Sequence, residues 1–192
     1  AATGKIILPI VDLLWSHDSK RIITHLLDTR NVKPGLQLIQ HVPEEGVRPT
    51  VLYEGRKVAM LGDEVVDAWQ LLSIEVDTGV IQALDHKPFP MNYPPYLGYF
   101  IAGRAWWDQD SEHAYFIYQE SDRTHTSVSR WNAKTGHSQI IFNEEPKTHA
   151  ILGDSDKNRV VATPLPNSDE LVWLSERSGW AHFYLYDLTT GA

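Results

Sequence analysis

The chain has 192 residues, a formal net charge of −8 and no cysteine. These values exclude a disulfide framework and a thiolate nucleophile or metal site, and they argue against a nucleic-acid-binding surface, which needs clustered Lys and Arg. Seven Trp and eight Tyr are many for this length, and aromatic side chains favour β-strands. No apolar run reaches the roughly 18 residues that a membrane-spanning helix needs, and the first residues lack the pattern of a signal peptide.

The first half of the chain is predicted to consist of short strands separated by turns. An Asp18-Ser19 turn joins the first two strands, and Thr78-Gly79 joins the last two as a hairpin. The apolar run 65–72 fits a strand better than a helix, and no helix longer than one or two turns is expected. The predicted strands span residues 11–15, 21–27, 36–41, 50–59, 70–77 and 80–84.

A proline-rich stretch, HKPFPMNYPPYLG over residues 86–98, follows. Its four prolines exclude a central strand, because proline cannot donate a hydrogen bond to a neighbouring strand. We therefore expect an extended connection between two sheets.

The second half alternates between apolar and polar residues with a period of two, which is typical of strands. In the last hairpin, Leu171 and Trp173 share one face, and Phe183 and Leu185 alternate with tyrosines after a turn at 177–179. The predicted strands span residues 101–107, 114–120, 126–132, 138–143, 148–152 and 159–163, followed by the two strands of that hairpin.

Two motifs recur along the chain. The first motif is seen when residues 118–136, YQESDRTHTSVSRWNAKTG, are aligned without a gap with residues 173–191, WLSERSGWAHFYLYDLTTG. Residues 71–79, LLSIEVDTG, resemble the C-terminal part of this motif. The second motif is a Trp followed by an Asp-Ser turn and an apolar run, and it occurs in LLWSHDSKRIITHLL and in AWWDQDSEHAYFIY. Such repeats are typical of propeller blades, which must stack on neighbours to bury both faces. An ordinary β-sandwich with coincidental turns is the alternative.

The sequence therefore predicts an all-β fold, a partial β-propeller of about two to three blades of four-stranded antiparallel sheets. Residues 1–192 as a whole are interpreted as a fragment of a larger propeller. Blade-like units are expected over residues 11–84, 101–143 and 148–192.

Candidate catalytic and metal-binding patterns are weak. Gly136-His137-Ser138 and Gly153-Asp154-Ser155 lack the second glycine of a nucleophile elbow. The nine histidines are scattered without the spacing of a zinc site. The acidic pairs Glu44-Glu45 and Glu144-Glu145 are interpreted as solvated turn carboxylates, since neighbours on an extended chain point apart. No catalytic, cofactor-binding or metal-binding residue is predicted, and no cofactor.

Two aromatic stretches remain. Trp106-Trp107 and NYPPY (92–96) could line a groove for a peptide or a sugar, but packing between blades is the favoured interpretation.

Five segments carry a resemblance to a known family: WSHDSKRI, LQLIQHVPEEGVRP, RKVAMLGDE, GRAWWDQDSEHAYF and ELVWLSERSGWAHFYLYDLTTG. They resemble the N-terminal β-propeller of the dipeptidyl peptidase IV family, in its bacterial branch. The resemblance extends over most of residues 11–192, and WLSERSGWAHFYLYD is its most specific part.

The resemblance implies a serine exopeptidase that removes N-terminal dipeptides, usually with Pro or Ala in second position. In that family an eight-bladed propeller caps an α/β-hydrolase domain that holds the Ser-Asp-His triad. That domain is expected after Ala192, and the glutamate pair that binds the substrate amine is expected before Thr3. Glu44-Glu45 does not match that pair, so no residue of this chain takes a catalytic or amine-binding role from the resemblance.

The function expected is that of a propeller fragment that gates and positions peptide substrates for a dipeptidyl peptidase and is inactive alone. A non-catalytic propeller that binds protein or carbohydrate is the alternative. The expected partners are peptide substrates, through the full-length enzyme, the hydrolase domain of the parent protein and a second copy of the fragment. No nucleic acid is expected as a partner, and no membrane-spanning segment is expected within the fragment. Family members are often exported in bacteria, which favours the periplasm or the exterior, with the cytoplasm left open.

Overall fold

The computed structural model describes residues 5–6, 13–28, 68–90, 100, 103–120, 124–145 and 162–192. Within these residues every regular element is a strand, which confirms the all-β prediction, and none forms a helix long and apolar enough to cross a membrane. The strands are β1 (Lys5–Ile6), β2 (Leu14–Trp15), β3 (Arg21–Asp28), β4 (Ala68–Glu75), β5 (Ile81–Ala83), β6 (Phe89–Pro90), β7 (Ala105–Trp107), β8 (His113–Gln119), β9 (Thr126–Asn132), β10 (Ser138–Glu144), β11 (Ala162–Pro164), β12 (Glu170–Ser175) and β13 (His182–Asp187).

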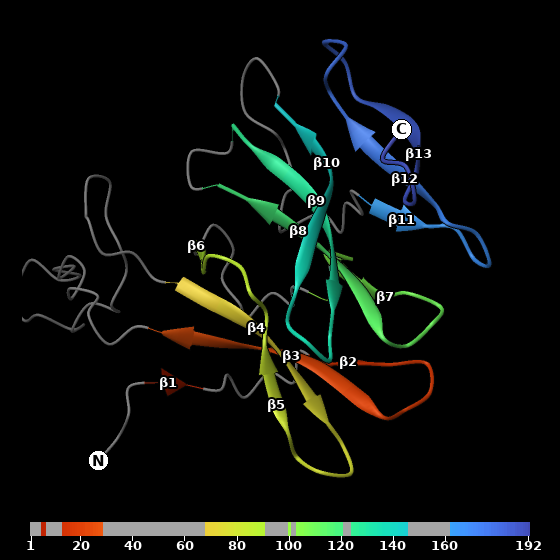
Figure 1. Cartoon of the computed structure of the whole chain (residues 1–192). Helices are drawn as coiled ribbons and strands as arrows, with labels where there is room; N and C mark the ends of the chain where they lie inside the picture. Colours follow the sequence, from red (N-terminus) through yellow and green to blue (C-terminus); the bar gives the residue numbers. More distant parts are fainter. Residues whose placement is uncertain are drawn as a thin grey trace, which may run out of the picture.

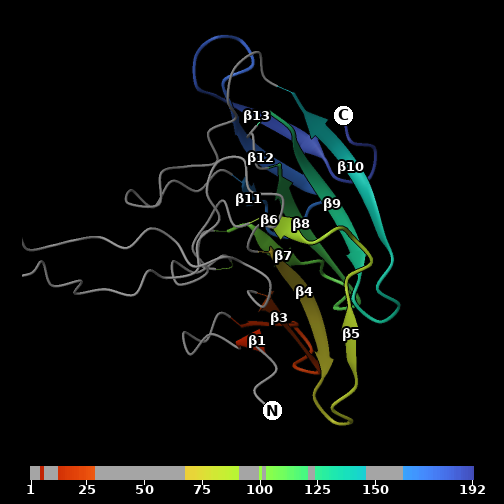
Figure 2. The same ribbon diagram turned by 90° about the vertical axis from the view of Figure 1, so that its left-hand side faces the viewer.

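The strands form three antiparallel sheets, which we call blades 1, 2 and 3 (Figure 1). Blade 2 has the order β10-β9-β8-β7, and blade 3 has the order β11-β12-β13. Blade 1 is built on β3 and β4, with β1 and β2 both paired to β3 and with β5 and β6 both paired to β4. The view in Figure 2 shows blade 2 between the other two. This is the stacked arrangement of a partial β-propeller.

Some sequence predictions differ from the structure or cannot be compared with it. Blade 1 extends beyond the predicted limits 11–84, because β1 and β6 also pair with its central strands. Pro90 belongs to β6, a two-residue edge strand, where a proline removes no hydrogen bond from the middle of a sheet.

Several predicted features lie outside the described residues: the strands at 36–41, 50–59 and 148–152, the NYPPY stretch, Glu44-Glu45 and Gly153-Asp154-Ser155.

The predicted Thr-Gly turn occurs once in each blade with the same hydrogen bonds. The glycine N–H donates to the carbonyl four residues earlier, from Gly79 to Glu75, from Gly136 to Asn132 and from Gly191 to Asp187. All three glycines have a positive φ, between 70° and 85°. Glycine adopts this conformation without steric cost, which explains why the same residue recurs in the turn that follows β4, β9 and β13.

The Asp-Ser turn also recurs, and the structure adds a third copy that the sequence comparison missed. In each blade a backbone N–H donates to the carbonyl five residues later, from Ser16 to Arg21, from Asp108 to His113 and from Leu165 to Glu170. The third copy reads Leu165-Pro-Asn-Ser-Asp-Glu170 and has no Asp-Ser pair, so only its backbone geometry identifies it.

Alternating side chains divide the core into two layers, one on each face of blade 2. The layer between blades 1 and 2 contains Trp69, Leu71, Phe89, Phe116 and Trp131. The layer between blades 2 and 3 contains Ile117, Val128, Phe142, Trp173 and Tyr186. As predicted, the Trp106-Trp107 pair packs between blades: Trp107 belongs to the first layer and Trp106 packs against the second. Because adjacent residues of a strand point to opposite faces of the sheet, these two tryptophans contribute to different core layers.

Glu144, the last residue of β10, links blade 2 to blade 3. Its carboxylate accepts hydrogen bonds from Trp173 Nε1 at 2.5 Å and from Ser175 Oγ at 2.7 Å, and its side chain is buried. The prediction of a solvated turn carboxylate is therefore wrong for Glu144, because β10 runs on to this residue and carries it under blade 3. Glu145, one residue further, is exposed as predicted.

Candidate functional site

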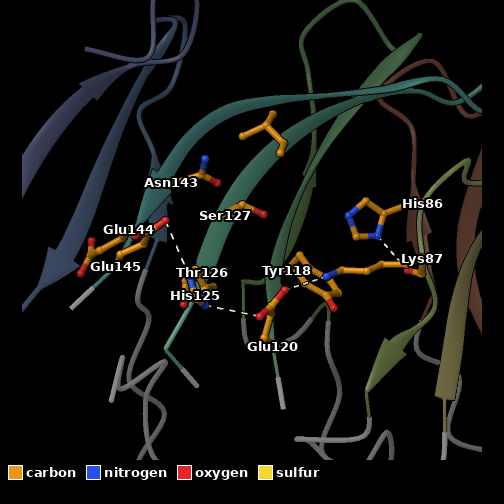
Figure 3. A pocket seen from close by; sticks show the side chains of 11 residues that line it. His86, Lys87, Tyr118, Glu120, His125, Thr126, Ser127, Asn143, Glu144 and Glu145 are labelled. Atoms are coloured by element: carbon orange, nitrogen blue, oxygen red, sulfur yellow. Dashed lines mark hydrogen bonds and ion pairs between the residues drawn. The ribbon is translucent and has the colours of Figure 1, made fainter. Parts of the chain in front are cut away.

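A hollow of about 200 Å³ lies where the connection between β5 and β6 meets the ends of β8, β9 and β10. We call it the blade 1–2 pocket (Figure 3). Blade 1 contributes two consecutive residues of that connection, and blade 2 contributes the rest from three adjacent strand ends. Its lining residues are His86, Lys87, Tyr118, Glu120, His125, Thr126, Ser127, Ile140, Asn143, Glu144 and Glu145.

A chain of polar contacts crosses the floor of the pocket. Lys87 Nζ lies 2.7 Å from Glu120 Oε1 and 4.8 Å from the centre of the Tyr118 ring. His125 lies between two carboxylates, with Nδ1 3.4 Å from Glu120 and Nε2 3.8 Å from Glu145. The hydrogen bond that the Lys87 ammonium donates to the Glu120 carboxylate raises the pKa of Lys87, so this group stays charged at neutral pH.

Aromatic rings form the wall behind Lys87. The imidazole of His86 lies 4.7 Å from the ring of Tyr118, 5.4 Å from Phe116 and 5.5 Å from Phe89. Its Nδ1 lies 2.8 Å from the carbonyl of Lys87. Burial lowers the pKa of His86, because the rings replace the water that would solvate an imidazolium. His86 is therefore neutral at physiological pH.

We expect the chain to lose stability on mild acidification through His86. Since its pKa is lower in the folded state, only the unfolded chain takes up the proton between the ordinary value of 6.5 and the lower folded value. The charge of Lys87 acts in the same direction and that of Asp85 in the opposite one. Thermal unfolding between about pH 7.5 and pH 5 measures the effect. The His86→Leu variant should lose less stability over this range than the wild type.

A matched control is His17→Gln, at an exposed turn position, which should keep the pH dependence of the wild type. Equal pH slopes for the wild type and His86→Leu would contradict the assignment.

The arrangement favours binding over covalent chemistry. Carboxylates outnumber the ammonium three to one around the pocket, and Ser127 and Asn143 add polar groups (Figure 3). Such a lining suits a ligand that donates hydrogen bonds, such as an extended peptide with its N–H groups. Within the described residues, no three His, Asp or Glu side chains gather in a way that could hold a metal ion.

Sequence reasoning did not find this pocket. Glu120 and His125 are brought together by the β8–β9 pairing, in which Gln119 lies opposite Thr126. A correct prediction of the register between these two strands would have placed Glu120 next to His125. Lys87 comes from another blade, and no sequence signal available in a single chain places it there.

The sequence comparisons identify the family. Residues 73–192 match the family model described as "Dipeptidyl peptidase IV (DPP IV) N-terminal region", whereas no curated protein matches. The chain belongs to the dipeptidyl peptidase IV family. The match begins inside β4 and includes blades 2 and 3, so the family resemblance read from the sequence is confirmed.

Solved structures of dipeptidyl peptidase IV proteins have the same fold. One, from Porphyromonas gingivalis, is dipeptidyl peptidase 4, with a TM-score of 0.64 and 17% identity over 91% of this chain. Another, from Bacteroides ovatus, is described as a candidate dipeptidyl aminopeptidase IV, with a TM-score of 0.64 and 16% identity over 93% of this chain. The chain spans only 22% and 23% of those two structures, respectively, so these similarities concern the propeller fold alone.

Proposed function

We propose that this chain is part of the β-propeller of a serine exopeptidase that releases dipeptides from the N-termini of peptides. The match of residues 73–192 to the dipeptidyl peptidase IV N-terminal region carries the proposal. In this role the propeller admits and positions peptide substrates, while acyl transfer takes place in a hydrolase domain of the parent protein.

The blade 1–2 pocket supports a role in positioning. Its carboxylates and the amide oxygen of Asn143 can accept hydrogen bonds, and Lys87 pairs with Glu120 across the floor of the pocket. An extended peptide offers N–H donors at regular intervals and needs acceptors of this kind.

We expect the purified chain of 192 residues to show no hydrolysis of a chromogenic Xaa-Pro dipeptide, because no Gly-x-Ser-x-Gly elbow occurs in its sequence. The full-length gene product should hydrolyse the same substrate and lose this activity with a serine-directed inhibitor. Turnover by the chain alone that the inhibitor blocks, or an inert full-length protein, would contradict the proposal.

The gating role has a separate test in the full-length protein. The same N-terminal dipeptide is offered as a short chromogenic substrate and at the N-terminus of a folded protein. Gating predicts rapid release from the first and much slower release from the second. Equal rates would leave the propeller without a role in size selection.

A binding platform without catalysis is the second candidate, because the blade 1–2 pocket supplies hydrogen-bond acceptors and the sequence supplies no nucleophile elbow. A full-length protein that binds peptides in calorimetry but hydrolyses none would favour it.

A further inference from the structure

The two sides of the blade 1–2 pocket differ in how their charges are paired. On the side that blade 1 enters, Lys87 and Glu120 form an ion pair at 2.7 Å. The opposite side is lined by Ser127 of β9, Asn143 of β10 and Glu145, just beyond β10 (Figure 3). Among the described residues, the Glu145 carboxylate has one charged contact, with His125 Nε2 at 3.8 Å, and its side chain is 67% exposed. This side of the pocket therefore carries a negative charge without a close cation.

Ser127 gives an independent sign of a ligand. The residue is only 7% exposed, and it lines the pocket with its hydroxyl extending from β9 toward His86 (Figure 3). Within the part of the chain that the structure describes, this hydroxyl makes no hydrogen bond. A side-chain hydroxyl buried to this degree normally has a hydrogen-bond partner. A polar group of a ligand in the pocket would supply the partner.

His86 adds a hydrogen-bond acceptor from blade 1. Its Nδ1 lies 2.8 Å from the carbonyl oxygen of Lys87, which can only accept, so Nδ1 carries the hydrogen. Because burial lowers the pKa of His86, the ring is neutral and Nε2 has a free lone pair. Figure 3 shows Nε2 on the side of the ring that faces Ser127. The pocket thus has acceptors on both of its sides.

The size and the charge of the pocket define the ligand. Pockets for drug-sized molecules measure about 300–1,000 Å³, whereas this one measures about 200 Å³ and suits a single side chain. The free acceptors and the uncompensated carboxylate favour a cation with several N–H donors. A guanidinium has five such donors in one plane, and it can also stack on an aromatic ring such as that of Tyr118.

We propose that the blade 1–2 pocket receives the guanidinium of an arginine side chain in a peptide substrate. Glu145 is its counter-ion, and Ser127 Oγ and His86 Nε2 accept hydrogen bonds from it. The inference rests on the proposed function, because the arginine is taken to belong to a peptide that the parent enzyme admits. It adds a preference among those peptides for the ones that contain arginine.

Calorimetry on the full-length protein tests the preference with two peptides, N-acetyl-glycyl-arginyl-glycine amide and its citrulline analogue. The acetyl group removes the free amine on which an N-terminal peptidase acts, so binding is measured without turnover. Citrulline keeps the shape of arginine but has no charge. We expect the arginine peptide to bind at least about tenfold more tightly, as hydrogen bonds to a charged group predict. Equal affinities would overturn the proposal.

Three variants show whether the arginine binds in this pocket. Glu145→Gln should abolish the preference for arginine over citrulline, and Ser127→Ala should weaken binding of the arginine peptide about threefold or more. The matched control is Glu112→Gln, which removes the same charge from an exposed position in the turn between β7 and β8. It should bind both peptides as the wild type does. Circular dichroism shows whether each variant is folded. A preference for arginine that survives both pocket substitutions would overturn the proposal.

Hydrolysis of a chromogenic Xaa-Pro dipeptide separates this inference from the proposed function. A full-length protein that hydrolyses the dipeptide but binds both acetylated peptides equally would refute the arginine site alone. A protein that hydrolyses no such dipeptide but binds the arginine peptide through Glu145 would refute the peptidase assignment and leave the pocket as an arginine site.

Discussion

Replacing Trp173 with alanine is expected to lower the free energy of unfolding by about 3–5 kcal/mol, the range measured for large aromatic truncations in cores. The side chain is 1% exposed and lies edge-on to Phe142 of blade 2, with ring centres 5.4 Å apart. Its removal leaves a cavity between blades 2 and 3. It also leaves the buried Glu144 carboxylate with one hydrogen-bond donor fewer, and an unsatisfied buried acceptor adds to the cost.

Chemical denaturation of the variants measures the loss. Trp180→Ala is the matched control, because Trp180 is 78% exposed in the turn that follows the same strand, and its loss should cost less than about 0.5 kcal/mol. Trp173→Phe keeps most of the packing but removes the hydrogen bond to Glu144, so it should fall between these two. Equal stabilities for Trp173→Ala and Trp180→Ala would contradict the buried placement.

Gly136→Ala and Gly191→Ala are expected to destabilise the chain far more than Gly79→Ala. All three glycines have a positive φ, so each substitution costs about 1–2 kcal/mol for the left-handed conformation alone. At Gly136 the new methyl group would also lie 2.5 Å from the carbonyl oxygen of Ala83. Backbone atoms of the neighbouring blade would have to move, which adds about 1–3 kcal/mol of overpacking.

Gly79 supplies the control within the chain, since it has the same turn and the same sign of φ but open space around the new methyl group. Melting curves of the three variants separate the two contributions. If Gly79→Ala proved as damaging as the other two, the cost would come from the turn alone and the close approach between blades would be refuted.

The sequence by itself determined the local structure. Period-two alternation and aromatic content predicted the β9 strand, the strands of the last hairpin and the β4–β5 hairpin. The recurring Thr-Gly turns predicted repeated units, because a glycine is favoured wherever the backbone must turn with a positive φ. The segments that resemble the dipeptidyl peptidase IV family also predicted the family correctly, as the match of residues 73–192 confirms.

Only the tertiary structure decided which face of each strand is covered, and by what. Alternation of apolar and polar residues separates the two faces of a strand, but the same pattern occurs on a buried face and on an exposed one. The sequence therefore could not show that Val128 is buried and that Phe183 is exposed. It also could not show that Glu144 lies beneath blade 3 or that Lys87 reaches Glu120, because these contacts join residues of different sheets. Stacking of whole sheets depends on long-range packing, whereas turns and strands depend on near neighbours in the chain.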